Sequence, residues 1–133
     1  MKTAQELFDH VVAALVKQGR PSVIPFGDTE MTCVYNGPEG LACAAAHCVP
    51  ENLRPLLEER TSWRFQSQFL VKSVGNMALV IDLQGAHDRR TSGLITWWRE
   101  SWVTQMYYVA EKHALSTELL TELATEEWRN SDV

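Results

Sequence analysis

The sequence predicts a mainly α-helical domain, a compact bundle of about five helices with one small strand or hairpin near residues 32–36. Two observations predict this fold class. Apolar residues recur three or four positions apart over much of the 133-residue chain, which is the spacing of amphipathic helices. The composition, 45% hydrophobic and 22% charged, is that of a globular chain long enough to bury one core. We therefore expect residues 1–133 to form a single domain.

The first helix is predicted over residues 4–18 by signals at both of its ends. Thr3 and Glu6 have the spacing of a capping box, in which each side chain bonds the backbone N–H group of the other residue. Gly19 suits the left-handed position that follows a helix. Residues 20–31 contain two prolines and a glycine without any period, so we expect an extended loop there.

A turn-rich segment follows. Residues 32–35 suit a short strand, and the glycines and proline of residues 36–40 are typical of a tight turn. Residues 41–49 are rich in alanine and cysteine, which favours a short buried helix, although a returning strand stays open as an alternative. Residues 51–60 are expected to form a short amphipathic helix, with three leucines turned inward: Leu53, Leu56 and Leu57.

Three further helices are predicted in the second half of the chain. Helical spacing of apolar residues runs over residues 67–88 and again over residues 94–113. Thr91 or Ser92 is expected to cap the start of the second of these helices. A last amphipathic helix is expected over residues 116–128.

The charge distribution argues against a nucleic acid as the partner. The net charge is −5, and residues 116–133 contain five acidic residues and a single arginine. A protein that neutralises a run of phosphates needs a basic patch or stripe. The basic residues here form no cluster larger than the pair Arg89 and Arg90. We therefore expect a partner other than nucleic acid.

The N-terminal segment and the cysteines indicate the compartment. The first ten residues contain acids and no long apolar run, so we expect no signal peptide, and no stretch is apolar enough to span a bilayer. Three cysteines, an odd number without an export signal, are typical of reduced thiols. These features predict a protein of the cytoplasm that makes no membrane contact.

Two spaced motifs resemble those of small, uncharacterised proteins encoded by bacteriophages and prophages. They are Cys33-x-Tyr35-x-Gly37-x-x-Gly40-x-x-Cys43-Ala44 and Leu83-Gln84-x-x-His87-Asp88. The order of the predicted elements is similar too, although Ala46 stands where those proteins have a glycine. The resemblance implies a phage accessory protein that acts inside a bacterial cell, and it implies no particular activity.

The cysteine-rich corner has a metal-binding interpretation as an alternative. Cys43 and His47 would share one face of a helix because they are four residues apart, and Cys33 could face them across the turn. His87 or Asp88 would then complete a zinc site. However, the spacing lacks the paired cysteines of compact zinc motifs, and buried cysteines commonly behave as small hydrophobic residues. We therefore expect these thiols to pack in the core, with no metal or other cofactor.

A catalytic interpretation of the same region is the second alternative. His87 and Asp88 form an adjacent His-Asp pair, a pattern that occurs in metal-dependent hydrolases. Cys43 could also join them in a nucleophilic triad. No spacing elsewhere in the chain supports either arrangement. A His-Asp pair at a helix end more often bonds backbone groups and holds the adjoining loop. The sequence therefore favours a protein that is not an enzyme.

The helix predicted before the last one is rich in aromatic residues. They fall in two rows, one containing Trp98 and Trp102 and the other containing Trp97 and Tyr108. One helix cannot bury both rows in a core this small, and tryptophan, tyrosine and arginine are the usual anchors of protein interfaces. The expected partner-binding residues are Trp97, Arg99, Trp102 and Tyr108 of this helix, with the acids Glu122 and Glu126 of the next.

Together these features predict a non-enzymatic accessory protein that binds a host protein in the bacterial cytoplasm, for example as an inhibitor of a host or defence function. Binding to a second copy of the chain, as a homodimer, stays open. The alternative is a small metal-binding or hydrolytic domain that uses Cys33, Cys43 and His47 with the His87-Asp88 pair.

Overall fold

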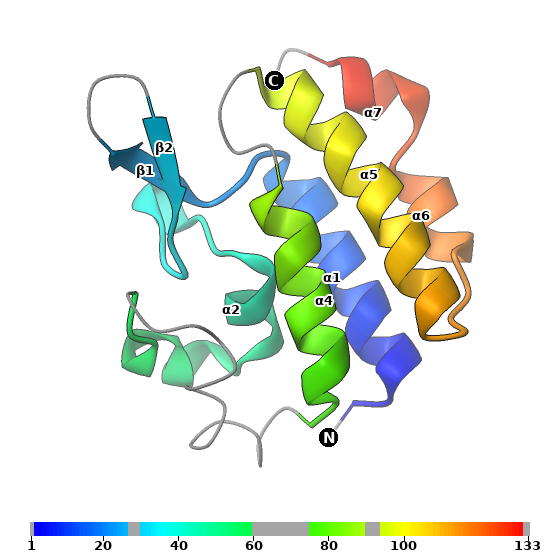
Figure 1. Ribbon diagram of the computed structural model, residues 1–133, viewed down its shortest axis with the longest axis horizontal. Coiled ribbons are helices and arrows are strands. Elements are labelled where there is room, and N and C mark those ends of the chain that lie inside the picture. The colour runs from blue at the N-terminus through cyan, green and yellow to red at the C-terminus, as the bar shows by residue number, and fades with distance from the viewer. Residues whose placement is uncertain (1, 27–29, 60–74, 90–93, 132–133) are drawn as a thin grey trace.

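The protein is a mainly α-helical bundle with one two-stranded hairpin, as seen in a computed structural model that describes residues 2–26, 30–59, 75–89 and 94–131 (Figure 1). The predicted fold class is therefore confirmed. The hairpin and α2 lie on one side of α4, and α5, α6 and α7 lie on the other. The elements are α1 (Ala4–Gln18), β1 (Val23–Phe26), β2 (Glu30–Cys33), η1 (Pro38–Gly40), α2 (Ala44–Cys48), η2 (Glu51–Leu56), α4 (Met77–Asp88), α5 (Ile95–Lys112), α6 (Glu118–Leu123) and α7 (Glu126–Asn130).

Helix α1 has the bounds and both end signals that the sequence predicts. The Thr3 hydroxyl accepts from the Glu6 N–H group at 3.1 Å, and the Glu6 carboxylate accepts from the Thr3 N–H group at 3.0 Å. At the other end Gly19 has a φ of 74°, and its N–H group donates to the Leu15 carbonyl at 2.8 Å. The capping box and the left-handed glycine therefore fix where this helix begins and ends.

The extended loop predicted over residues 20–31 is wrong, because most of the described residues there belong to the antiparallel hairpin of β1 and β2. Pro25 lies opposite Met31. The Val34 N–H group donates to the Ser22 carbonyl at 3.0 Å, and the alternation of an antiparallel ladder then makes Pro25 and Met31 a pair without mutual hydrogen bonds. A strand tolerates proline at such a position because no ladder bond is lost.

The segment after the hairpin has the predicted types of structure, with shifted bounds. β2 ends at Cys33, two residues before the end of the predicted strand, and α2 is the short buried helix expected within residues 41–49. The amphipathic helix expected over residues 51–60 is instead the 3-10 helix η2. Its tighter winding breaks the α-helical spacing, so Leu57 is buried whereas Leu56 is 66% exposed, and the inward placement predicted for Leu56 is wrong.

The later helices differ from the prediction at their ends. The described part of the helix predicted over residues 67–88 is α4, which begins at Met77, directly after Gly75 and Asn76 with their left-handed φ angles of 68° and 45°. The earlier part of that prediction and the predicted caps Thr91 and Ser92 lie outside the described residues.

The last predicted helix is two short helices, α6 and α7. Thr125 separates them, because its backbone is extended and its hydroxyl accepts from the Trp128 N–H group at 3.1 Å, which starts a new helix. Leu120 is fully buried, and Leu119 and Leu123 pack against the core from its edge, as the sequence predicts for the inner face.

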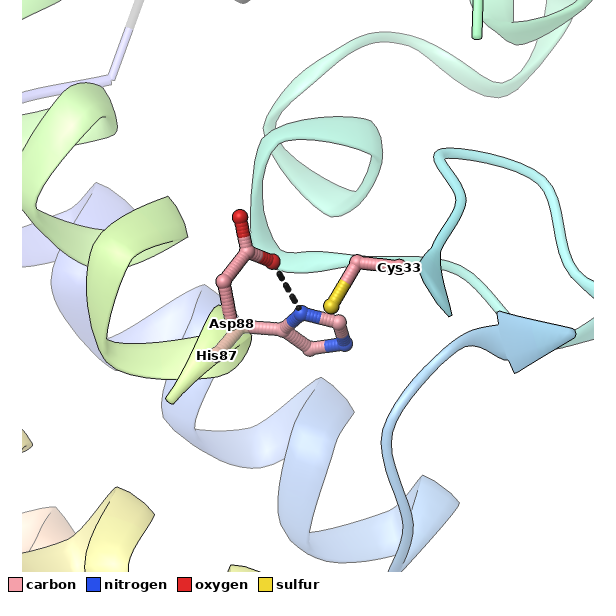
Figure 2. A group of neighbouring side chains, drawn as sticks. All are labelled: Cys33, His87 and Asp88. Atoms are coloured by element: carbon pink, nitrogen blue, oxygen red, sulfur yellow. Dashed lines mark hydrogen bonds and ion pairs between the residues drawn. The ribbon is translucent and has the colours of Figure 1, made fainter. Parts of the chain in front are cut away.

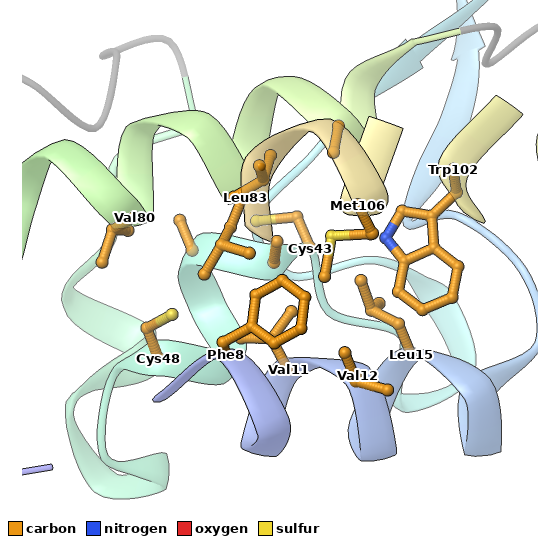
Figure 3. Close-up of a cluster of buried hydrophobic side chains, with 14 of the residues drawn as sticks. Phe8, Val11, Val12, Leu15, Cys43, Cys48, Val80, Leu83, Trp102 and Met106 are labelled. Carbon is orange, nitrogen blue, oxygen red and sulfur yellow. The ribbon is translucent and has the colours of Figure 1, made fainter. Parts of the chain in front are cut away.

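The core lies between α1, α2, α4 and α5 (Figure 3). Phe8 of α1 is fully buried, and Leu83 of α4 and Met106 of α5 belong to the same cluster. Cys43 and Cys48 are buried there as thiols. Cys43 is the N-cap of α2 and Cys48 is its last residue. Both thus serve as small apolar side chains, as buried cysteines commonly do.

Candidate functional site

The two sequence motifs meet at the C-terminal turn of α4. Cys33, the last residue of β2, lies beside His87 and Asp88, and one ligand atom from each lies within 4.8 Å of the others. Figure 2 shows the Cys33 side chain pointing toward the imidazole of His87. Within the described part of the chain, this is the group of histidine, cysteine and acidic side chains that is close enough to surround a metal ion.

Both ring nitrogens of His87 already have partners. Nε2 accepts from the backbone N–H group of Ser22 at 2.9 Å, so the proton of the neutral ring must be on Nδ1. Nδ1 lies 2.9 Å from a carboxylate oxygen of Asp88 and donates to it (Figure 2). In addition, the Trp98 indole N–H group donates to the His87 carbonyl at 2.8 Å. His87, which is 0% exposed, thus joins α4 to the start of the hairpin and to α5.

Gln84 extends this network to α2. Its side-chain oxygen accepts from the Ala45 N–H group, in the first turn of α2, at 2.8 Å. Its side-chain nitrogen donates to the Asp88 oxygen that also accepts from His87, at 3.0 Å. We call Gln84, His87 and Asp88 the polar junction. Its three side chains connect α4 with α2 and with the segment between α1 and β1.

The bonds of the polar junction oppose both metal binding and proton transfer. A metal ion on Nδ1 of His87 would move the ring proton to Nε2, where it would meet the N–H group of Ser22. A general base needs a lone pair that can reach the reacting proton. The Nε2 lone pair is directed at Ser22, so His87 cannot take a proton from the Cys33 thiol without losing that bond. The geometry is therefore that of a structural connection.

The predicted alternative metal ligands Cys33, Cys43 and His47 are not brought together. Cys43 is the N-cap of α2, where its sulfur accepts from a backbone N–H group at 3.4 Å, and burial raises the pKa of its thiol to about 12. His47 lies near the other end of α2, with Nε2 3.0 Å from the side-chain oxygen of Gln18. Burial, and then the charge of Arg54, lowers the pKa of His47 to about 4. The raised pKa of Cys43 suppresses formation of its thiolate. A triad with Cys43 as the nucleophile is therefore disfavoured.

A groove of about 550 Å³ lies beside His47, between the first half of α1 and the segment that follows α2. Apart from Lys2, its basic side chains have structural partners. His10 Nε2 lies 3.0 Å from the His47 carbonyl, and Arg54 Nε donates to the Ala46 carbonyl at 2.9 Å. These carbonyls belong to the last turn of α2, and the Ala46 carbonyl also accepts from the Val49 N–H group at 3.2 Å. Two glutamates in the wall offset the remaining positive charge. The groove therefore does not present an anion site.

The prediction that Trp102 binds a partner is wrong, because this residue is 0% exposed. Its ring stacks on Trp98 with centroids 5.6 Å apart and an interplanar angle of 10°, and the edge of Trp128 packs against it. The row that the sequence assigns to Trp98 and Trp102 is therefore the inner face of α5.

Arg99 is also wrong as a partner-binding residue, because it is 2% exposed and its guanidinium is used inside the fold. Its Nε donates to the Gly19 carbonyl at 2.8 Å, and Nη1 donates to the carbonyls of Trp128 and Ser131, each at 2.8 Å. These acceptors lie at the C-terminal ends of α1 and α7, where carbonyls lack helical partners and a positive charge is favourable. Arg99 thus holds two helix ends against α5.

Trp97 and Tyr108, in contrast, lie on the surface, where they are 54% and 61% exposed. They are eleven positions apart, which is about three helical turns, so they share one face of α5 roughly 16 Å apart. Ser101 and Thr104 lie between them on this face. We call Trp97, Ser101, Thr104 and Tyr108 the open face of α5. It carries two large aromatic groups that the fold itself leaves uncovered.

The predicted acidic residues are exposed, but they do not adjoin the open face as a group. Glu122 lines a hollow with Gln5 and Asp9 of α1. Its neighbour Thr121 is the residue that contacts α5, through the hydroxyl of Tyr107 at 2.7 Å. Glu122 therefore faces α1. Glu126 is exposed in the first turn of α7. The structure thus separates the aromatic part of the predicted surface from much of its acidic part.

A second apolar surface adjoins the N-terminal end of α5. Leu94, Ile95 and Met31 are exposed there, and they line a groove of about 400 Å³ between α5 and the hairpin. Leu94 is one helical turn from Trp97. Exposed apolar side chains therefore continue from the open face toward the hairpin.

Ser22 was not singled out from the sequence, and Gln84 was named only as part of the second motif, without a role. Gln84 and Asp88 are four residues apart, which is a spacing at which helical side chains meet, so this signal was present. Ser22 and His87 are 65 positions apart, and no local pattern links a backbone N–H group to a histidine over that separation.

No protein-family model matches the chain, and comparisons with curated proteins and with solved structures find no match either. Within the described ranges, no helix combines the length and the apolar composition that crossing a membrane requires. The contrast between the polar junction and the open face of α5 is therefore what bears on function.

Proposed function

We propose that this protein acts by binding another protein through the open face of α5, and that it is not an enzyme. The observation that carries the proposal is the exposure of Trp97 and Tyr108, at 54% and 61%, on one face of a helix whose other side is fully packed. Large exposed aromatic side chains on a rigid element are the usual anchors of protein interfaces.

The energetics support this use of the open face. Covering a half-exposed tryptophan or tyrosine removes apolar surface from water, at about 25 cal/mol per Å². Each of the two rings would therefore contribute on the order of 2 kcal/mol to an interface, before the costs of association. Because α5 is anchored by Trp98, Trp102 and Arg99 beneath, the helix that carries both rings is held in place, and only the side chains have to be ordered on binding.

The resemblance to bacteriophage and prophage proteins supports a bacterial host protein as the partner. On this proposal the chain is a phage accessory factor in the host cytoplasm, and covering a surface of the partner would inhibit a host or defence function. The reduced state of Cys33, Cys43 and Cys48 is compatible with that compartment.

The polar junction supports the non-enzymatic part of the proposal. Hydrolysis by His87 and Asp88 would need a ring nitrogen that is free to bind a metal or accept a proton. Both nitrogens of His87 are engaged, one by a backbone N–H group. The metal-binding or hydrolytic alternative would therefore require the start of the hairpin to move away from α4.

The test is affinity capture from a bacterial lysate followed by direct binding of the captured protein in purified form. The wild-type chain is compared with the double variant Trp97→Ala/Tyr108→Ala. We expect at least one protein to be enriched with the wild type and lost with the double variant, and its dissociation constant to rise at least tenfold, since each ring is an anchor.

The matched control is Leu56→Ala, which removes another strongly exposed apolar side chain at a site away from α5. It should capture the same proteins as the wild type. Equal capture by the wild type and the double variant would show that the open face is not the contact surface, and the proposal would then fail.

A further inference from the structure

We infer that the open face of α5 pairs with the same face of a second copy of this chain, so that two α5 helices cross antiparallel in a symmetric dimer. This inference rests on the proposed function, because it uses the same face, and it names the occupant of that face in the purified protein. In a solution of the purified protein, a second copy is a partner that is always present.

The spacing on the open face is the first argument. Along α5 the order is aromatic, small, small, aromatic, and the intervals between Trp97, Ser101, Thr104 and Tyr108 are four, three and four residues. This order reads the same in both directions. A two-fold interface uses one patch on both subunits, so the patch must be complementary to its own reversed image. An antiparallel pair places Trp97 opposite the second copy's Tyr108.

The sizes of the side chains are the second argument. Ser101 and Thr104 lie at the midpoint of the face, where the two helices would cross. Small residues at the crossing let helix axes approach to about 8 Å, the lower end of the usual range. The bulky Trp97 and Tyr108 then flank the crossing, where they can pack along the opposite helix. Aromatic pairs in such arrangements contribute beyond the area that they bury.

The charges at the rim are compatible with antiparallel pairing. Glu111 lies one turn beyond Tyr108, so in the dimer it would reach the level of the second copy's Leu94, at the start of that α5. The start of a helix carries partial positive charge, and a carboxylate there is favourable. In parallel pairing, Glu111 would instead meet the second copy's Glu111.

The area available is sufficient for a weak specific dimer. Trp97, Tyr108 and Leu94 each have more than half of their surface exposed. With the side chains around them they could bury roughly 500 Å² per copy, or about 1,000 Å² in the pair, which is near the lower limit for a specific interface. We therefore expect a dissociation constant in the micromolar range.

Sedimentation velocity of the purified chain from about 1 to 500 µM tests this inference. The expected result is a shift from the 15.1 kDa monomer to twice that mass as the concentration rises. Added salt should not weaken the dimer, because both copies carry a net charge of −5 and salt screens their repulsion. A basic partner on the same face would show the opposite salt dependence.

Two variants assign the dimer to the open face. Trp97→Ala should weaken it at least tenfold, and Ser101→Arg should do the same by placing a long charged side chain at the crossing. Neither side chain is buried, so both variants should keep the wild-type helix content in circular dichroism. Leu56→Ala is the control and should dimerise like the wild type.

A monomer throughout this range, or a dimer that persists in both variants, would overturn the inference. The outcomes also separate it from the proposed function. A monomer that still captures a host protein through Trp97 removes the second copy and leaves the proposed function intact. A Trp97-dependent dimer that captures no other protein supports the inference and contradicts host binding.

Discussion

The C-terminal turn of α4 and the outer side of α5 use their most conspicuous residues in opposite ways. At α4, the sequence offers His87 and Asp88 as candidate catalytic or metal-binding residues. In the structure, their polar atoms are directed at Ser22, at Gln84 and at each other. At α5, Trp97 and Tyr108 look like surplus core residues, yet the fold leaves more than half of each exposed.

The difference shows that residue type alone is a poor guide to function in this chain. A buried polar group costs stability unless it is hydrogen bonded, so a histidine whose bonds all go to the protein is accounted for by the fold. The exposed surface of a tryptophan, in contrast, contributes no burial to the stability of the fold. The group without a structural use is therefore the better candidate for a contact with another molecule.

Among the residues of the polar junction and of the open face, the largest effect is expected from His87→Ala. The substitution leaves the buried N–H group of Ser22 without its acceptor and opens a cavity against Trp98. We expect the free energy of unfolding to fall by about 3–4 kcal/mol, measured by urea denaturation. Asp88→Asn is the control, because it keeps an acceptor oxygen, and it should cost less than about 1 kcal/mol. Similar losses for both variants would contradict the network described here.

A smaller effect is expected from pH, through His47. Burial and the charge of Arg54 lower its pKa to about 4, whereas the unfolded chain takes up the proton near pH 6.5. The unfolded state therefore binds more protons between these values, and stability falls as the pH falls through that window. Between pH 7.5 and 5 the expected loss is about 2 kcal/mol. His47→Gln should remove that part of the slope in urea denaturation, and an unchanged slope would count against the assignment.

A third, still smaller effect is expected from Gln84→Ala. The Ala45 N–H group in the first turn of α2 loses its acceptor, and Asp88 loses one of its two donors. We expect a loss of about 1–2 kcal/mol in the free energy of unfolding. Gln84→Glu retains the acceptor but places a carboxylate against Asp88, so it should not restore stability fully. A loss below about 0.5 kcal/mol for the alanine variant would remove Gln84 from the junction.

The smallest effect on stability is expected from Trp97→Ala, although this residue is larger than any of the others. Its ring lies mostly in water, so the free energy of unfolding should change by no more than about 0.5 kcal/mol in dilute solution. Trp102→Ala is the matched comparison on the same helix, and its loss should be about 3–5 kcal/mol because that ring is fully buried. Equal losses would mean that the two rows of α5 are not distinct.

Much of the fold could be predicted from local patterns, and the exceptions have identifiable causes. The capping box of Thr3 and Glu6 located α1 to the residue, because both signals act within one turn. The sequence predicted a small strand or hairpin near residues 32–36, but β1 was missed because Pro25 is typical of a loop, and only its register opposite Met31 makes it acceptable in a strand.

The site was less predictable because it depends on long-range contacts. The division of α5 into one row with Trp98 and Trp102 and another with Trp97 and Tyr108 followed from helical spacing. Spacing alone did not show that the Trp102 row is the inner one, and Trp102 was still expected to bind a partner. The burial of Arg99 could not be inferred, because its acceptors at Gly19, Trp128 and Ser131 come together only when α1 and α7 reach α5. From the sequence alone, an arginine between aromatic residues is predicted to be an interface anchor. Only the positions of the two helix ends show that its partners lie inside the fold.

Hydroxyl-radical footprinting of the tryptophans, at low and at high protein concentration, tests the central claim most directly. In dilute solution Trp97 should be oxidised much faster than Trp98 and Trp102, and its oxidation should slow as the concentration rises and a second copy covers it. Equal oxidation rates for Trp97 and Trp102 in dilute solution, or a Trp97 rate that does not change with concentration, would contradict the account.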